Sequence, residues 1–472
     1  MEVARSNYIK ENKALFKKLQ SLLSEKYDYA SVLVCDGRQQ NFAVSAQGVR
    51  ISDGNMFGKR GFVVRVHGGK AYAEYAGNEI SEEKIPEILK EIDGRLSEMA
   101  DSWDRYITPV IEEEKTEFIK CTEYEIHPEE MGDEKIIEKL ADIREKTKSL
   151  DERLLDCSAS LSYQYYNKLF LSDKKDLEEN VLWTCGSLAV LAARGQEIKD
   201  SYKGFSVLGG AELLDEMEGY GPKLVKTCIE LLDSEPMIPG EYECICAPET
   251  TGMIVHEAFG HGVEMDMFVK DRALAKNCMG DMIASELVTM RDGAASAKEV
   301  ASFFFDDEGV LAHDTLVIDH GKLVSGYADA VSAARLGVEA TGNGRRESVE
   351  RKAYTRMTNT FFEGGHDKVE DMIASVKYGM LLESPSSGME DPKNWGIQCM
   401  VSIAREIKDG KLTGRIFSPC VLTGYVPDLL KSISMMSEKV ELGGSGACGK
   451  GYKEWVKVSD GGPYIKAKIR LG

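Results

Sequence analysis

The sequence predicts an α+β fold in two domains, over residues 1–235 and 236–472. Helix-like and strand-like stretches follow one another through the first half, which predicts helices packed on antiparallel strands. After the stretch SEPMIPGEYE, residues 234–243, glycine becomes frequent and the strands become short. Two prolines and a glycine make this stretch the best domain boundary, and the length of 472 residues also favours more than one domain.

The first block of the amino-terminal domain begins with a helix predicted over residues 8–25 and ends with one over 81–101. In the second helix, Leu89, Ile92, Leu96 and Met99 fall at helical spacing. Strand-like runs between the helices occupy residues 29–35, 41–46, 61–67 and 70–76.

A second block repeats this order and suggests an internal repeat. A helix is predicted over 133–149, with Ile136, Ile137, Leu140 and Ile143 on one face. Strand-like runs follow at 154–171 and 181–193, and a helix near 210–233 completes the block.

The carboxy-terminal domain is predicted to be mostly β, with one short buried helix around HEAFGH, residues 256–261. The turn signals DDEG, DHGK and KDGK separate its short strands.

Composition excludes some functions. The chain has 59 basic and 79 acidic residues, a net charge of −20, which argues against binding nucleic acid. The first residues, MEVARSNYIKENKALFKKLQ, lack the apolar centre of a secretory signal, and no apolar run is long enough to cross a membrane. Eleven cysteines without a spacing framework indicate reduced thiols. We therefore expect a cytoplasmic protein with no nucleic-acid or membrane partner.

The stretch IVHEAFGHGVEMD, residues 254–266, carries the clearest chemical signal. His256 and His261 are five residues apart, so a regular helix would turn them about 140° away from each other. A π-bulge or kink would bring them back to one face. We expect Gly260 to absorb this distortion, because glycine tolerates unusual backbone angles. Thr250 or Thr251 is the predicted helix cap.

A catalytic zinc usually takes three protein ligands, so two histidines leave one to be found. Candidates are Glu286 and the distant Cys448, which has glycines around it. His313, His320 and His366 lie in turn-rich stretches and are predicted to be on the surface. The alternative is that His256 and His261 are ordinary histidines beside glycine turns.

The stretch around Cys448, GGSGACGKG, also nearly matches two nucleotide-binding patterns. Both patterns need a strand before and a helix after the glycines. Only 21 residues follow Gly451, so we do not expect nucleotide binding.

Three motifs in order, HEAFGHGVEMD, ATGNGRRES with RMTNTFFEGG, and GACGKG, resemble the TldD/PmbA family of metallopeptidases. The likeness is to the TldD-type subunit, which carries the metal motif. It implies zinc (Zn2+) held by His256, His261 and Cys448, with Glu257 as the catalytic base. It also implies a homodimer, or a heterodimer with a PmbA-like subunit, whose enclosed cavity admits unfolded peptides. The sequence departs from the family after CGK, where GYKEWVKVSDGGP replaces a glycine-rich run.

The residues agree with this chemistry. A thiolate and two neutral imidazoles leave a zinc site with a net charge of about +1, which still polarises a carbonyl and acidifies water. Glu257, beside a ligand, is placed to take a proton from that water. Glu264 and Asp266 are candidates to orient a ligand imidazole, with surface roles as the alternative.

Asn343 and Gly344 predict a tight turn, which leaves Arg345 and Arg346 either solvated or bound to a peptide. We take Asn343, Arg345 and Arg346 as candidate substrate-binding residues.

The leading hypothesis is a zinc-dependent metallopeptidase that hydrolyses unstructured peptides. The alternative is a non-catalytic regulatory or peptide-binding subunit with a structural zinc. Glu257 favours the enzyme, because a structural site needs no acid beside its ligand. A third hypothesis is a modulator that binds DNA or gyrase directly, and the net charge of −20 argues against direct contact with DNA.

Overall fold

The computed structural model describes residues 1–54, 57–68, 71–100, 113–451 and 454–472. The first half supplies eight strands: β1 (Tyr29–Ser45), β2 (Gly48–Gly54), β3 (Gly61–Gly68), β4 (Ala71–Gly77), β5 (Thr116–Cys121), β6 (Leu154–Leu171), β7 (Lys175–Arg194) and β8 (Glu197–Val207). They form one sheet in the order β4-β3-β1-β6-β7-β5, with β2 paired to β1 and β8 paired to β7. The runs predicted over 29–35 and 41–46 are one long strand, β1.

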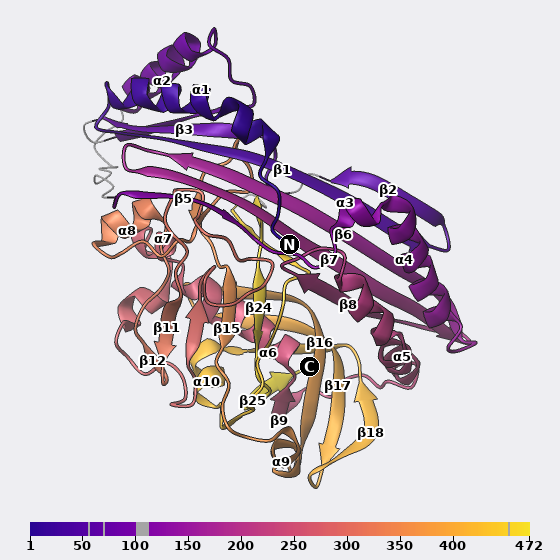
Figure 1. The fold of residues 1–472 in the computed structure, drawn as a ribbon. Coiled ribbons are helices and arrows are strands. Elements are labelled where there is room, and N and C mark those ends of the chain that lie inside the picture. Colours follow the sequence, from indigo (N-terminus) through magenta and orange to yellow (C-terminus); the bar gives the residue numbers. More distant parts are fainter. Residues whose placement is uncertain (55–56, 69–70, 101–112, 452–453) are drawn as a thin grey trace.

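Helices cover one face of this sheet: α1 (Asn7–Ser24), α2 (Ile85–Ala100), the short α3 (Pro128–Met131), α4 (Asp133–Lys148) and α5 (Leu213–Leu231). Side chains alternate along β1, so Val32 and Val34 join the core under α1 and α2. Leu33 and Cys35 point the other way and pack against Phe305 of the second half. The sheet therefore separates the helices from the carboxy-terminal half (Figure 1).

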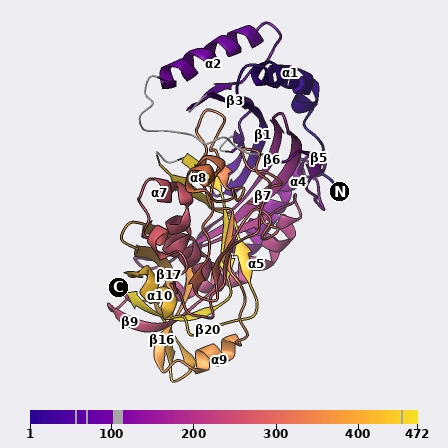
Figure 2. The same ribbon diagram turned by 90° about the vertical axis from the view of Figure 1, so that its left-hand side faces the viewer.

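The predicted helices of the first half match these elements within a few residues. Two predicted positions lie outside the described residues: residue 101 of the helix over 81–101, and residue 70 of the strand-like run over 70–76. Each predicted block, α1 to α2 and α4 to α5, contributes its strands to the same sheet. Figure 2 shows α1 and α2 over one end of the sheet and α4 and α5 lower down.

The second half contains two larger sheets. One has β9 (Gly240–Cys246), β16 (Tyr378–Asp391), β17 (Gly396–Lys408), β18 (Lys411–Phe417), β19 (Cys420–Tyr425), β20 (Met435–Met436) and β25 (Ile465–Leu471). The other has β10 (Met290–Asp292), β11 (Thr315–Asp319), β12 (Lys322–Leu323), β15 (Asn359–Phe362), β21 (Glu441–Gly443) and β24 (Ser459–Gly462). Two short hairpins pair β13 (Gly344–Arg345) with β14 (Tyr354–Thr355), and β22 (Ala447–Lys450) with β23 (Glu454–Lys457).

Several short helices lie among these strands: α6 (Pro248–Ile254), the π-helix η1 (Val255–Gly260), the 3₁₀ helices η2 (His261–Val263) and η3 (Leu274–Cys278), α7 (Met265–Val269), α8 (Ala330–Leu336), α9 (Val369–Ala374) and α10 (Val426–Lys431). The predicted α+β fold is confirmed, but the expectation of a single short helix in this half is wrong. Helices of one or two turns are too short to show a clear apolar period in sequence. No helix among the described residues is both long and apolar enough to cross a membrane.

The helical segment α6–η1 is buried between the two sheets. It contacts β16 of one sheet and β15 and β24 of the other. Ile254, Val255 and Phe259 are each fully buried in the main core of this half. Burial on both sides fixes the segment that carries the two histidines.

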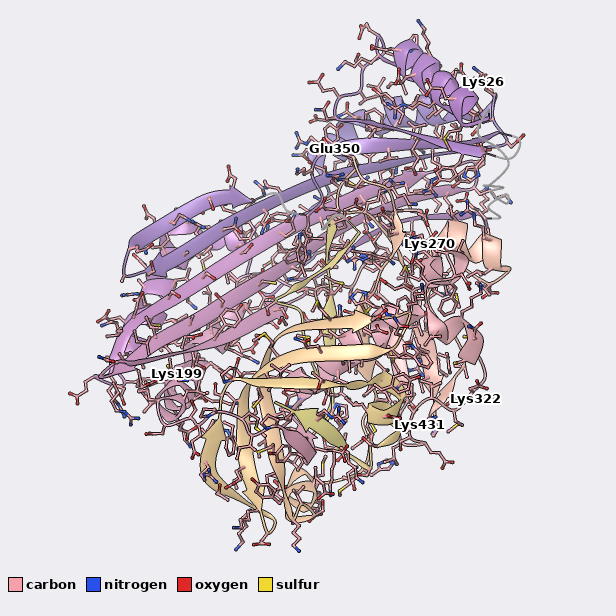
Figure 3. All side chains as sticks on the ribbon, turned by 180° about the vertical axis from the view of Figure 1, so that it is seen from behind. Lys26, Lys199, Lys270, Lys322, Glu350 and Lys431 are labelled. Atoms are coloured by element: carbon pink, nitrogen blue, oxygen red, sulfur yellow. The ribbon has the colours of Figure 1, made fainter. Side chains whose placement is uncertain are left out.

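Ion pairs join the two halves around the loop 306–309. Arg65 of β3 pairs with Glu308 at 2.6 Å, and Lys168 of β6 pairs with Asp307 at 3.0 Å. Side chains fill the space between the large sheet and the second half (Figure 3). Because the halves share these contacts, their independence as domains 1–235 and 236–472 stays a prediction.

Candidate metal centre

The segment around His256 and His261 changes from α-helix to π-helix. In η1, the His261 N–H donates to the carbonyl of His256, five residues back. This wider turn places residues five apart on the same face. The two imidazole rings accordingly lie with centroids 5.2 Å apart and planes at 87°. The predicted π-bulge is confirmed.

Gly260 is needed for a different reason from the one predicted. Its backbone angles, φ −55° and ψ −54°, are those of any helical residue. A Cβ at this position, however, would overlap the Sδ of Met357. The Gly260 carbonyl also accepts a hydrogen bond from the hydroxyl of Tyr327. Gly260 therefore permits close packing and does not supply unusual backbone angles.

The prediction that Thr250 or Thr251 caps the helix is wrong. Ala247 is the residue before the first turn, and Pro248 begins α6. Proline suits this position because its missing N–H would have no partner there. The hydroxyls of Thr250 and Thr251 instead donate to backbone carbonyls inside the core.

Cys448 of the β22–β23 hairpin reaches the two histidines. Its Sγ lies 3.4 Å from His261 Nε2. The possible ligand atoms of His256, His261 and Cys448 all lie within 4.8 Å of one another, the one such group of three found among the described residues. Arg356, fully buried, donates to the carbonyls of Cys448 at 2.6 Å and Glu454 at 2.9 Å, which fixes the hairpin.

The charges at this cluster favour a thiolate. Burial by itself would raise the pKa of Cys448, but His261 and His256 hold it well below its usual value. Burial likewise opposes protonation of His261, yet Cys448 and Glu264 raise the pKa of that imidazole well above its usual range. These charges favour a thiolate paired with an imidazolium, and a cation bound there would replace the proton.

His261 has an outer partner that fixes its orientation. Its Nδ1 lies 3.2 Å from Glu264 Oε2. Lys450 donates to Glu264 at 2.9 Å and to Asp266 at 2.6 Å. Glu264 thus has the orienting position predicted for it, whereas Asp266 contacts lysines and not an imidazole. With Nδ1 held by Glu264, Nε2 faces Cys448.

His256 lacks such a partner. Its buried Nδ1 has no hydrogen bond within the described part of the chain, and Asp460 Oδ2 lies 3.8 Å away. Burial raises the pKa of Asp460 to about 6, and His256 opposes the shift.

Glu257, directly after His256 in the chain, is half-buried. It packs on Gly388 of β16, where a Cβ would lie 3.0 Å from Glu257 Cδ. Glu390, from the same strand, also faces the site. Burial raises the pKa of Glu390 well above its usual range, with His261 opposing and Glu257 adding to the shift.

Other candidates lie elsewhere. Glu286 is exposed and does not join the cluster, so the structure offers it no role as the third ligand. His313, His320 and His366 are exposed, as predicted. The glycines around Cys448 belong to a hairpin, and within the part of the chain that the structure describes no helix follows them, as nucleotide binding would require.

The candidate substrate-binding residues are mostly occupied within the protein. Asn343 is fully buried and donates to Asp292 at 2.6 Å and to the carbonyl of Arg356 at 2.9 Å. Arg346 is buried and pairs with Glu74 of the first half, so the expectation of a solvated side chain is wrong for it.

Arg345 is half-buried and donates to the carbonyl of Met357 at 2.7 Å. Substrate binding by these three stays a prediction, and their partners favour structural roles for Asn343 and Arg346.

Sequence reasoning did not find Arg356, Lys450, Glu390 or Asp460. Lys450 carries a weak signal, since it is two residues from Cys448. Arg356 begins the RMTNTFFEGG motif, which by itself assigns it no role. Glu390 and Asp460 lie in strand sequence without a motif, and only the fold places them beside the histidines.

The donor set fits zinc. Two imidazoles and a thiolate are typical zinc ligands, and three protein ligands leave one position open for catalysis. One ligand atom of each of the three residues lies within 4.8 Å of the others, close enough for all three to bind one ion.

Comparisons with known proteins agree with this chemistry. Residues 239–470 match the family described as PmbA/TldA metallopeptidase C-terminal domain. A metalloprotease of Methanocaldococcus jannaschii is 27% identical over 453 residues, covering 95% of this chain and 98% of that protein. A zinc metalloprotease TldD homolog of Saccharolobus solfataricus is 28% identical over 325 residues, covering 66% of this chain and 71% of that protein.

A solved structure shows the same fold over both halves. TldE from Thermococcus kodakarensis matches with a TM-score of 0.74 and 18% identity, covering 97% of this chain and 100% of that one. The domain match and the relatives named TldD homologs place the carboxy-terminal half of the chain, residues 239–470, in the TldD/PmbA family.

Proposed function

We propose that the protein is a zinc-dependent metallopeptidase that hydrolyses unstructured peptides, with Glu257 as the base. The observation that carries this proposal is the meeting of His256, His261 and Cys448 beside Glu257. The relatives named metalloproteases support the same reaction class.

His256, His261 and Cys448 would hold the zinc through imidazole nitrogen and thiolate sulfur. Zinc in such a site supplies Lewis acidity to a carbonyl and to a water molecule. Lys450 and Glu264 keep His261 oriented, and Arg356 keeps Cys448 in place, so little reorganisation is needed on binding.

Glu257 would accept the proton of the attacking water and pass it to the amine that leaves when the peptide bond breaks. Its partial exposure suits this role, because a base must be reachable by water and substrate. Its place directly after a ligand keeps it within the same rigid turn as His256.

The proposal includes a paired assembly around an enclosed cavity, formed with a second copy or with a PmbA-like subunit. The likeness of fold to TldE supports a subunit of that kind as partner. A cytoplasmic location is supported by the cysteines, all eleven of which are free.

The test combines metal analysis with peptide digestion of the full-length protein. We expect about one zinc per subunit, and hydrolysis that stops when zinc is removed. The variant Glu257→Gln should retain zinc but lose about 10²- to 10⁴-fold in kcat, since it keeps the shape but not the base.

Two results would contradict this function. Hydrolysis by Glu257→Gln within a few-fold of the unaltered protein would remove Glu257 as the base. A zinc-loaded protein that cleaves no unfolded peptide, alone or with a PmbA-like subunit, would favour a structural zinc in a peptide-binding subunit.

A further inference from the structure

Glu390 presents a buried carboxylate without a side-chain partner beside the metal cluster. Both of its carboxylate oxygens are buried and make no hydrogen bond of normal geometry within the described residues, and the backbone N–H of Gly262 is a favourable group close to them. The ion pairs found in the same part of the chain do not include Glu390 either. An ionised carboxylate in this place is unfavourable unless a cation lies beside it, so a ligand that carries a cation would suit this site.

Two glycines make room for this carboxylate and for Glu257. A Cβ on Gly262, next to His261, would lie 2.8 Å from Glu390 Oε1. A Cβ on Gly388 would lie 3.0 Å from Glu257 Cδ. Any side chain at either glycine would displace an acid, so the backbone of η2 and β16 is shaped around the pair.

The charges nearby leave Glu390 uncompensated. Glu257 and Glu264 act on it with the same sign, while His261 and the backbone N–H of Gly262 oppose them. The nearby cation Lys450 is already bound to Glu264 and Asp266. With a metal bound, His261 would be neutral, and a cation brought by the substrate would then be the partner that Glu390 lacks.

We propose that Glu390 binds the free amino terminus of the peptide substrate, so that the enzyme removes residues from amino-terminal ends. This inference rests on the proposed peptidase function and names its substrate class. In a peptide cleaved after its first residue, a single carbon separates the ammonium from the carbonyl that is attacked. The group that binds the ammonium must therefore lie close to the base, and Glu390 is two residues along β16 from Gly388, on which Glu257 packs.

The experiment compares one peptide sequence, without lysine or arginine, in free and amino-terminally acetylated forms. The zinc-loaded full-length protein should cleave the free form with a kcat/KM roughly 10- to 100-fold higher, the value of a charge-assisted hydrogen bond. Glu390→Gln should lower this ratio to about one, mainly by raising KM for the free peptide. Glu286→Gln, an exposed acid outside the cluster, is the control that should keep the ratio.

Three outcomes would overturn the inference. The unaltered protein could cleave both forms equally. Glu390→Gln could lower hydrolysis of both forms by the same factor, which is the behaviour of a residue needed only for the fold. Finally, an acetylated peptide with a lysine side chain could be preferred in a Glu390-dependent way, which would assign the site to a basic side chain.

A binding measurement separates this inference from the peptidase function. In the Glu257→Gln background, calorimetry should give a roughly 10-fold or greater preference for the free peptide, lost on adding Glu390→Gln. If that preference is found while no form of the protein hydrolyses peptides, the peptidase function fails and the amino-terminus site stands. Equal binding of the two peptides would contradict the amino-terminus site alone.

Discussion

At the scale of single residues, Cys448 differs from the other buried cysteines. Burial raises the pKa of Cys399 and of Cys420 to about 12, which keeps both as inert thiols. Cys448 is buried as well, but two imidazoles lower its pKa well below the usual value. Because only the thiolate binds a metal well, this contrast marks Cys448 as the reactive cysteine of the three.

Replacing Cys448 with alanine should therefore remove most of the bound zinc. We expect the affinity to fall by more than about 100-fold, since loss of an outer partner alone costs about 10- to 100-fold. Zinc per subunit is measured after dialysis against a weak chelator. Cys420→Ala, another buried thiol, is the control and should keep its zinc. Undiminished zinc in Cys448→Ala would exclude the thiolate from the site.

At the scale of elements, the helix that carries the histidines shows how far sequence could predict the site. The five-residue spacing and the neighbouring glycine predicted a π-bulge, because a regular helix could not bring the imidazoles together. The reason for Gly260 could not be predicted, since it depends on Met357, which comes from a distant part of the chain. The sequence therefore predicted the local backbone geometry of this helix but not the residues that pack against it.

The contact with Met357 gives a prediction for this element. Gly260→Val should place a branched side chain where the Met357 sulfur lies, and so push η1 away from Cys448. We expect zinc affinity to fall by about 10-fold or more, as for other changes that disturb ligand orientation. Gly260→Ala should cost less than Gly260→Val.

A second substitution tests whether the contact with Met357 causes the loss of zinc affinity in Gly260→Val. Met357→Ala in the Gly260→Val background removes the overlapping sulfur and should restore part of the zinc affinity. The affinity is measured by competition with a chelator for all three variants. If Met357→Ala gives no recovery, the loss comes from the backbone of η1 and not from this contact.

At the scale of the whole molecule, the first half was easier to predict than the second. Its strands are long, up to the 20 residues of β7, and its helices have clear apolar faces. In the second half, strands of two to four residues such as β12 and β22 are too short to show an alternation of apolar and polar residues in sequence. Cys448 meets His261, 187 residues away in sequence. The residues alone left Cys448 and Glu286 as alternatives for the third ligand, and the family resemblance favoured Cys448.

The junction of the halves was not predicted at all, because its ion pairs join residues far apart in sequence. Glu74 of β4 meets Arg346 of the second half, while Arg65 binds both Glu74 and Glu308. Asp306 of the adjoining loop accepts the N–H of Gly344 at 2.8 Å, which links the junction to the strand that precedes Arg346. The orientation of the metal-bearing half against the large sheet thus depends on a few buried charges.

These charges predict a weaker junction in acid. Burial alone would raise the pKa of Glu74, but Arg65 and Arg346 lower it to about 2. A carboxylate with a lowered pKa in the folded state stabilises that state above its unfolded pKa, and this stabilisation is lost as the pH falls toward the folded value. Glu74→Gln should therefore lower the urea midpoint of unfolding at about pH 7, and the difference from the unaltered protein should shrink steadily between about pH 4.5 and 2.

Glu350→Gln, an exposed acid near the same junction (Figure 3), should leave the midpoint unchanged at both ends of that range. A difference for Glu74→Gln that stays constant with pH would show that Glu74 contributes by its shape and not by its charge.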